Sequence, residues 1–328
     1  MKYPVPQKGD KFLWIRFGAF GDLLEALADA YSIKQKFPYI KLSFMTLDKY
    51  VEIVQSQPYV DEVIVGEKTP LAVMFQTAKL MRMKKYDWVG STFKGGHMPI
   101  MAWLSGIKNR LGDTSYWSFL QTANIYDWTK ACGINLFRRT EKSLFATDSN
   151  IQFAKKILAP LEGKKKIFCV IGSNDADKMW PLSHWIELLK PLAQENWGIV
   201  INGYGTREEK MAGKIQTAVN SDNVLNLVSK YNIMQLIAVA GECQLAVGND
   251  SGPLHAAALC GVPSVGIFDY IPPKEIGFNA PWVTSVIAIN ENLQTFYAKR
   301  RNGEALAEIT PEIVRRKIDE LAEKWTDI

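Results

Sequence analysis

The stretch FLWIRFGAFGD, from Phe12 to Asp22, joins the signals of a buried strand, a glycine turn and the start of a helix. The apolar run Phe12–Phe17 predicts a strand, and residues 23–36 have the spacing of an amphipathic helix. Gly18 and Gly21 between them permit unusual backbone angles and the close approach of a ligand. A strand that leads into a helix through such a turn predicts a parallel βαβ unit.

Asp22 stands where the turn meets the helix, and the pattern leaves two interpretations of its carboxylate. The glycines do not fit the dinucleotide fingerprint GxGxxG, and Asp48, the first acidic residue after the next expected strand, lies farther on than that fingerprint requires. Asp22 either binds free amide groups at the helix N-terminus or acts as a general base at the mouth of a ligand cleft. Position alone leaves both interpretations open.

The alternation of short apolar runs and helical spacing continues to the end of the chain. Strands are expected at residues 12–17, 40–46, 61–65, 86–91, 108–112, 166–172, 199–203, 224–228, 245–249, 264–268 and 283–290. The sequence therefore predicts an α/β protein of two doubly wound, Rossmann-like domains, with parallel sheets facing a central cleft.

The domain boundary is expected at APLEGKKK, residues 159–166, where proline, glycine and three lysines follow a helical pattern. This gives an N-terminal domain at 1–160 and a C-terminal domain at 161–328. The final helix, 311–327, is a candidate to pack back on the N-terminal domain.

The composition is that of an ordinary globular protein: 328 residues, 47% hydrophobic and 22% charged. No apolar run reaches the roughly 18–20 residues of a membrane-spanning helix, and the N-terminus lacks a signal-peptide core, so a cytoplasmic location is expected. Four widely separated cysteines indicate reduced core residues. The net charge of +5 is dispersed over separate basic segments, which disfavours nucleic acid and leaves a solvated face or a phosphorylated, membrane-surface substrate.

Residues 247–268, VGNDSGPLHAAALCGVPSVGIF, carry the most specific pattern in the chain. A strand ends near Asn249, and Pro253 then opens a helix whose first amides, at Ser251 and Gly252, are free to bind an anion. Asp250 would repel a phosphate, so it is expected to orient the loop or a neighbouring lysine. His255, one turn into this helix, is expected to take part in ligand binding.

A third pattern, residues 171–189, delivers Ser173 and Asn174 to a polar loop after a strand. Lys178 follows just before a new helix, where its charge suits a diphosphate and a leaving group. The triplet Asp175-Ala176-Asp177 resembles a metal-binding DxD pair, but no histidine or third carboxylate lies near it, so no metal is expected.

A fourth pattern leaves a strand through Gly203 and Gly205 into a helix that begins with acidic residues. Glu208 and Glu209 suit the positive end of that helix. One of them could instead accept the two hydroxyls of a ribose.

These patterns together resemble the ADP-heptose:lipopolysaccharide heptosyltransferases of glycosyltransferase family 9, which have the GT-B fold. The carriers of the resemblance are IRFGAFGDLLEAL, KFPYIKLSFMT, YVDEVI, DKMWPLSHWIELL and NDSGPLHAAALCGVPSVGIF, in that order along the chain. The sequence departs from the family pattern near Ala28, where relatives carry a proline, and at Asp269, where relatives often have glycine.

The resemblance implies an inverting, metal-independent transfer of a sugar from a nucleotide diphosphate sugar, expected to be ADP-heptose, without a cofactor. It implies that the C-terminal domain binds the donor and the N-terminal domain the acceptor, a phosphorylated glycolipid at the cytoplasmic face of the inner membrane. Asp22 matches the general base, and Lys178 matches the lysine near the diphosphate. The implied donor-binding residues are Ser173, Asn174, Lys178, Glu208 (or Glu209), Asp250, Ser251, Gly252, Pro253 and His255, and the acceptor-binding residues are Arg16, Gly18, Gly21, Lys94 and Arg110.

Two alternatives remain at this level. One is a GT-B enzyme that uses another nucleotide sugar, either a transferase or an epimerase of the same architecture. The other is a nucleotide-sugar-binding protein without catalysis, against which the presence of both Asp22 and Lys178 argues.

Overall fold

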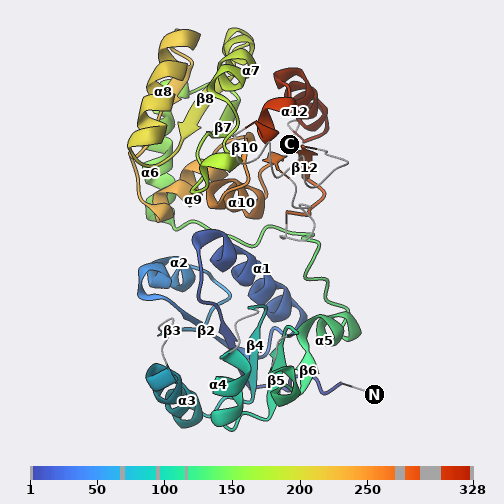
Figure 1. Ribbon diagram of the computed structural model, residues 1–328. Helices are drawn as coiled ribbons and strands as arrows, with labels where there is room; N and C mark the ends of the chain where they lie inside the picture. The colour runs from blue at the N-terminus through green and yellow to red at the C-terminus, as the bar shows by residue number, and fades with distance from the viewer. Residues whose placement is uncertain are drawn as a thin grey trace. The chain divides into compact units, whose positions relative to one another are not determined.

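The computed structural model describes residues 3–66, 71–93, 97–114, 117–269, 278–288 and 304–325. The chain divides into two compact units, Met1–Leu136 and Phe137–Ile328. Each unit contains a six-stranded sheet whose described pairings are all parallel, with helices on both faces (Figure 1). The predicted pair of doubly wound, Rossmann-like domains is confirmed.

The first unit has the strand order β3-β2-β1-β4-β5-β6. Its strands are β1 (Lys11–Ile15), β2 (Lys41–Thr46), β3 (Glu62–Val65), β4 (Trp88–Ser91), β5 (Asn109–Gly112) and β6 (Ala123–Asn124). Its helices are α1 (Phe20–Lys36), α2 (Val51–Gln55), α3 (Leu71–Lys84), α4 (Met98–Leu104) and α5 (Ile125–Ala131), with short 3₁₀ turns η1 (Asp48–Tyr50) and η2 (Ser118–Leu120).

Strand β1 shows why this sheet is covered on both faces. Successive side chains of a strand point to opposite faces. Leu13 and Ile15 join the apolar cluster under α3 and α4. Phe12, on the opposite face, stacks with Trp88 and lies next to the tilted ring of Trp128, which belongs to α5.

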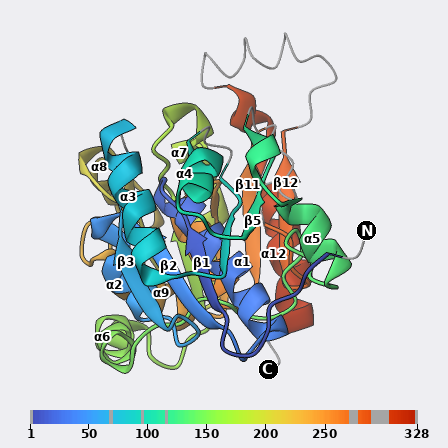
Figure 2. The ribbon, with the colours of Figure 1, turned by 90° about the horizontal axis from the view of Figure 1, so that it is seen from below.

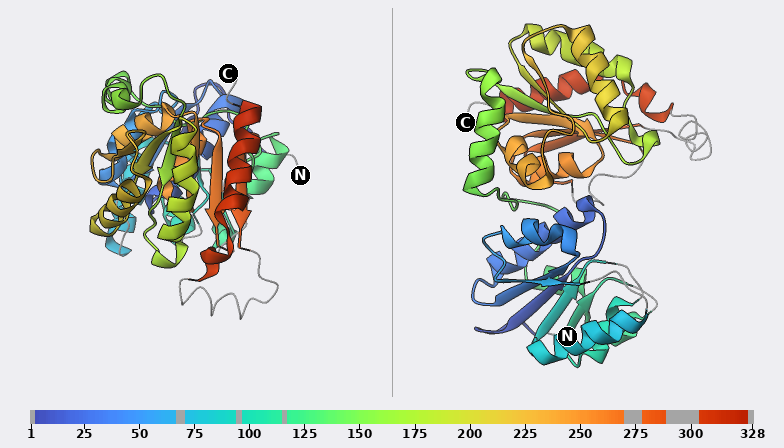
Figure 3. Two further views of the ribbon diagram at one scale, coloured as in Figure 1. Left: turned by 90° about the horizontal axis from the view of Figure 1, so that it is seen from above. Right: turned by 90° about the vertical axis from the view of Figure 1, so that its left-hand side faces the viewer.

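The second unit has the strand order β12-β11-β10-β7-β8-β9. Its strands are β7 (Lys166–Val170), β8 (Gly198–Asn202), β9 (Val224–Asn226), β10 (Leu245–Asn249), β11 (Ser264–Phe268) and β12 (Val283–Ile287). Its helices are α6 (Asp148–Leu158), α7 (Leu182–Gln194), α8 (Thr206–Val219), α9 (Ile233–Gly241), α10 (Gly252–Leu259) and α12 (Pro311–Trp325), with the 3₁₀ turns η3 (Ala159–Leu161), η4 (Ala176–Lys178) and η6 (Ala305–Glu308). Helices α7, α8 and α12 share the apolar cluster on one face of this sheet (Figure 3).

The domain boundary lies earlier than the linker APLEGKKK predicted. Helix α6 packs against α9 of the second unit, and the segment before it is bonded there as well, since the N–H groups of Ser143 and Leu144 both donate to the carbonyl of Leu259. The predicted boundary at 160/161 therefore falls inside the second unit, whose first residue is Phe137. Composition suggested a linker because η3 contains a proline and precedes lysines on the surface.

The final helix is built into the second unit, and its expected packing on the N-terminal domain stays a prediction. Helix α12 packs against α7 and strands β10 to β12, all in the second unit. Its Val314, Ile318 and Leu321 are buried in the core of that unit. In the described part of the chain, no helix is long and apolar enough to cross a membrane.

Candidate active site

Asp22 lies in the first turn of α1, just beyond the carboxyl end of β1. The helix begins at Phe20, so Asp22 is its third residue and not the residue that precedes it. Its Oδ2 accepts a hydrogen bond of 2.9 Å from the N–H of Ala19, and its Oδ1 accepts one of 2.8 Å from Nη2 of Arg16. The side chain is still 43% exposed. The carboxylate thus binds the helix N-terminus and remains accessible, so the two interpretations from sequence are compatible.

The two glycines of the turn have different roles. A Cβ on Gly18 would lie 2.5 Å from Oδ2 of Asp22, so only glycine lets the carboxylate fold back over the turn. A Cβ on Gly21 would meet no atom within 4 Å, so this position borders open space. Neither glycine has a positive φ, and the unusual backbone angles expected of them are absent.

Arg16 is buried and fixed beside Asp22. Its guanidinium carbon lies 5.4 Å from the ring centroid of Phe93, in addition to the ion pair with Asp22. A positive charge held by a ring and a carboxylate is well placed to orient that carboxylate. Arg16 is therefore a positioning group for Asp22, and its contact with an acceptor stays a prediction.

Two other predicted acceptor residues lie elsewhere. Lys94 falls outside the described residues. Arg110 of β5 is the strand partner of Val89 in β4, and Val89 is the partner of Leu13 in β1. Arg110 therefore lies well before the carboxyl ends of the strands, where Asp22 is found. Its guanidinium donates to the carbonyls of Ile107, Lys108 and Leu120, and burial lowers its pKa. These bonds to the main chain explain the residue structurally, and the acceptor contact stays a prediction.

In the second unit, Lys178 and Asp250, both partly buried, form one constellation with the buried His255. Nζ of Lys178 lies 2.6 Å from Oδ2 of Asp250, and Nε2 of His255 lies 3.1 Å from Oδ1 of the same carboxylate. Burial raises the pKa of Asp250, but hydrogen bonds and charges from His255 and Lys178 outweigh it and hold the pKa below its usual range. Asp250 orients a neighbouring lysine, as the loop sequence indicated.

Asn249 connects the two loops that carry this constellation, a role that was not predicted from the sequence. The residue is fully buried at the end of β10. Its Oδ1 accepts from the N–H of Trp180 at 3.0 Å, and its Nδ2 donates to the carbonyl of Ile171 at 2.8 Å. The loop after β7 is thereby held against the loop after β10, which places Lys178 beside Asp250. A polar amide at the end of an apolar run was the available signal.

The start of α10 has the geometry of an anion site. Ser251 precedes the helix in an extended conformation, and Gly252 and Pro253 are its first residues. Helix hydrogen bonding starts with the N–H groups of Leu254 and His255, which reach the carbonyl of Ser251. The positive end of the helix dipole and the amide of Gly252 thus lie beside the charge of Lys178.

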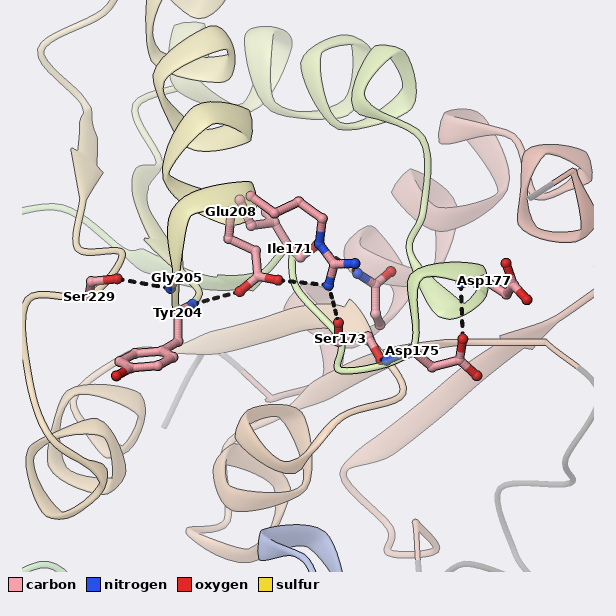
Figure 4. Close-up of polar contacts among 10 residues, drawn as sticks. Ile171, Ser173, Asp175, Asp177, Tyr204, Gly205, Glu208 and Ser229 are labelled. Carbon is pink, nitrogen blue, oxygen red and sulfur yellow. Dashed lines mark hydrogen bonds and ion pairs between the residues drawn. The ribbon is translucent and has the colours of Figure 1, made fainter. Parts of the chain in front are cut away.

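Glu208 is the acidic residue of α8 that lies beside Tyr204 and the loop carrying Ser173 (Figure 4). It is buried, whereas Glu209 is exposed. Its Oε2 accepts from the N–H of Tyr204 at 2.7 Å, and its Oε1 accepts from Nη2 of Arg207 at 3.1 Å. The same Arg207 nitrogen donates to the carbonyl of Ser173. Each carboxylate oxygen keeps a second lone pair, which suits a ligand with two neighbouring hydroxyls.

Gly172 makes room for this carboxylate. A Cβ there would lie 2.5 Å from Cδ and 2.7 Å from Oε2 of Glu208. Gly205 is required for another reason, because it precedes α8 with φ of +91°, a conformation that side chains rarely adopt. The sequence placed Gly172 at the polar loop and predicted the turn at Gly205, but the contact of Gly172 with Glu208 and the role of Arg207 were missed.

The remaining loop residues lie next to these groups. Ser173 is buried, and its Oγ accepts from the N–H of Asp175. Asn174 is exposed. Oδ1 of Asp175 accepts from the N–H of Asp177 and so caps the turn η4, which accounts for the acidic triplet structurally (Figure 4).

Two Rossmann-like units with polar groups beyond the carboxyl ends of their strands are the architecture of the GT-B fold. The model of glycosyltransferase family 9 (heptosyltransferase) matches residues 129–306, more than half of the chain. The protein belongs to this family and is a glycosyltransferase.

Individual relatives agree with this assignment. Lipopolysaccharide heptosyltransferase 2 of Salmonella typhimurium is 29% identical over 191 residues, 55% of this chain and 51% of that protein. Lipopolysaccharide heptosyltransferase 1 of Campylobacter coli is 23% identical over 82% of this chain and 86% of that protein. The structure of E. coli heptosyltransferase WaaC with ADP is similar in fold, with a TM-score of 0.69 and 18% identity over 97% of this chain and all of that one.

Proposed function

We propose that this protein is an inverting, metal-independent heptosyltransferase that moves a heptose from ADP-heptose to the lipopolysaccharide inner core. Relatives named for lipopolysaccharide heptosyl transfer support this substrate pair. The observation that carries the proposal is the constellation of Lys178, Asp250 and His255 at the start of α10, with Glu208 in the same unit. The acceptor is a phosphorylated glycolipid at the cytoplasmic face of the inner membrane.

The donor site follows from these charges. The two phosphates of ADP bind Lys178 and the free amides of α10, and the ribose hydroxyls donate to Glu208. As the bond between the anomeric carbon and the diphosphate breaks, negative charge grows on the leaving oxygen. Lys178 and the helix dipole stabilise that charge, and Asp250 keeps the lysine in place without reorganisation.

The acceptor site is assigned to the first unit. The acceptor hydroxyl attacks the anomeric carbon from the face opposite the diphosphate, which inverts its configuration. Its proton passes to the carboxylate of Asp22, which Arg16 and the N–H of Ala19 hold in a fixed direction. ADP leaves as the new glycosidic bond forms, and no protein nucleophile takes part.

A nucleotide screen tests the donor assignment. A ligand at 100 times its dissociation constant stabilises the folded state by about 2.7 kcal/mol, which raises the melting temperature of a domain of this size by roughly 5–10 °C. ADP should give this shift, and UDP, GDP and CMP should not. The variant Glu208→Ala should lose the response to ADP, and Glu209→Ala should keep it.

The outcomes separate the alternatives. A response to UDP or GDP in place of ADP would assign another nucleotide sugar. A response to ADP without transfer from ADP-heptose to a purified inner-core acceptor would indicate a binding protein without catalysis. No response to any nucleotide would contradict the donor site itself.

A further inference from the structure

One face of the first unit is built by α3, α4 and the turn η2. Helices α3 and α4 lie side by side, and η2 lies next to α4 (Figure 2). The inward side chains of α3 and α4, among them Met81 and Met101, share one apolar cluster with Leu13 and Ile15 of β1. The exposed side chains on the outer side of α3 and α4, on η2 and at Trp117 just before η2 form a surface that we call the aromatic face.

The aromatic face exposes large apolar side chains from each of its three elements. They are Phe75, Met83, Trp103, Trp117 and Phe119, and they are between 42% and 73% exposed. Single exposed apolar residues are normal on a protein surface, but a group on adjacent elements marks an interaction site. The rings of Trp117 and Phe119 contact each other, with centroids 5.8 Å apart.

The charge of the same segment is strongly positive. Residues 71–122 contain seven lysines and arginines and only two aspartates. Asp113 is buried, and Asp87 accepts a hydrogen bond from the N–H of Lys11. Lys79 and Lys108 are exposed, and no acidic side chain in the described part of the chain pairs with either. Lys84 is paired with Glu62, so the exposed charges that accompany the aromatic rings are those of Lys79 on α3 and Lys108 in the loop after α4.

We propose that the aromatic face binds the surface of an anionic lipid bilayer. Tryptophan and phenylalanine insert at the boundary between headgroups and acyl chains, and lysine binds the phosphates of anionic headgroups. A protein partner would need acidic groups against these lysines and a matching apolar surface, whereas an anionic bilayer supplies both at once. The inference rests on the proposed function for its purpose, since an enzyme with a lipid-anchored acceptor must work at a bilayer.

The test is co-sedimentation of the whole protein with vesicles, without nucleotide or acceptor. Vesicles of phosphatidylcholine with one third phosphatidylglycerol should bind the protein, pure phosphatidylcholine should bind it weakly, and added salt should release it. Trp103→Gln with Phe119→Gln should lower the partition coefficient about tenfold or more. Neutralising Lys79 or Lys108 with glutamine should lower it about fivefold each.

Matched substitutions in the second unit provide the control. Phe137→Gln removes an exposed aromatic ring, and Lys155→Gln removes an exposed charge from α6, so both should bind vesicles as the wild type does. The melting shift with ADP reports on the proposed function separately and should be equal in all of these variants.

Two results would overturn the inference. One is equal binding to neutral and anionic vesicles, or binding that the substitutions at Trp103, Phe119, Lys79 and Lys108 leave unchanged. The other is a dimer or larger oligomer in solution that these substitutions dissociate, because the face would then bind a second copy of the chain.

Discussion

Replacing Gly172 with alanine should weaken ADP binding while the second domain stays folded. The new Cβ would lie 2.5 Å from Cδ and 2.7 Å from Oε2 of Glu208. Carbon atoms in contact need about 3.5 Å or more, so the carboxylate must retreat by about 1 Å. Because these atoms end a flexible side chain, Glu208 can move and the backbone need not.

The displaced carboxylate is no longer in position to accept hydrogen bonds from the ribose hydroxyls. Oε2 also gives up its 2.7 Å hydrogen bond from the N–H of Tyr204. A hydrogen bond to a charged group contributes about 1.5–3 kcal/mol, so the loss of one such bond to ADP raises the dissociation constant about 10- to 100-fold.

Isothermal titration with ADP and urea unfolding measure the two effects. Gly213→Ala is the control, because a Cβ there meets nothing within 4 Å and the residue lies inside α8. It should leave the dissociation constant unchanged and raise the unfolding free energy by about 0.5–1 kcal/mol. Wild-type affinity for ADP in Gly172→Ala would refute the assignment of Glu208 to the ribose.

Three further predictions concern the charges of the donor site. Asp250→Asn removes the carboxylate that pairs with the partly buried charge of Lys178 and should lower the unfolding free energy by about 1–3 kcal/mol at neutral pH. The pKa of Asp250 in the folded protein lies below the ordinary value of 3.8, so its contribution to the unfolding free energy is complete above that pH and is lost as the pH falls through the lowered pKa. Urea titrations below pH 4 should therefore show a steeper decline of the unfolding free energy in the wild type than in the variant. Parallel declines would contradict the pairing. Lys178→Met should raise the dissociation constant of ADP and slow transfer, and unchanged values of both would remove its role. Transfer should persist in excess chelator, and loss that a divalent ion restores would instead assign a metal to Asp175 and Asp177.

The sequence predicted the fold well because its strands are apolar on both faces. Every strand except β6 was predicted to within a few residues. The two-residue strand β6 is too short to leave a periodic signal. The boundary was misplaced because the packing of α6 on α9 is a long-range contact, which local composition does not encode.

The site was predicted in part, and the missed residues share a physical cause. Asp22, Lys178 and Asp250 each stand in a local sequence motif, so the sequence around them was enough to predict them. Asn249 and Gly172 act through residues that are distant in the sequence, so only the folded sheet shows their importance. The preference for Glu208 over Glu209 depends on the rotation of α8, which the burial of Glu208 reveals.

Asp22→Asn, assayed for heptosyl transfer and for ADP binding, tests the central claim most directly. The substitution keeps the size of the side chain and an acceptor for the N–H of Ala19, but it removes the proton acceptor. We expect kcat to fall about 10²- to 10⁴-fold while the dissociation constant of ADP stays the same. The control Asp48→Asn, which changes an exposed acid of the same unit, should turn over normally. Transfer by Asp22→Asn at the wild-type rate would show that another group takes the proton.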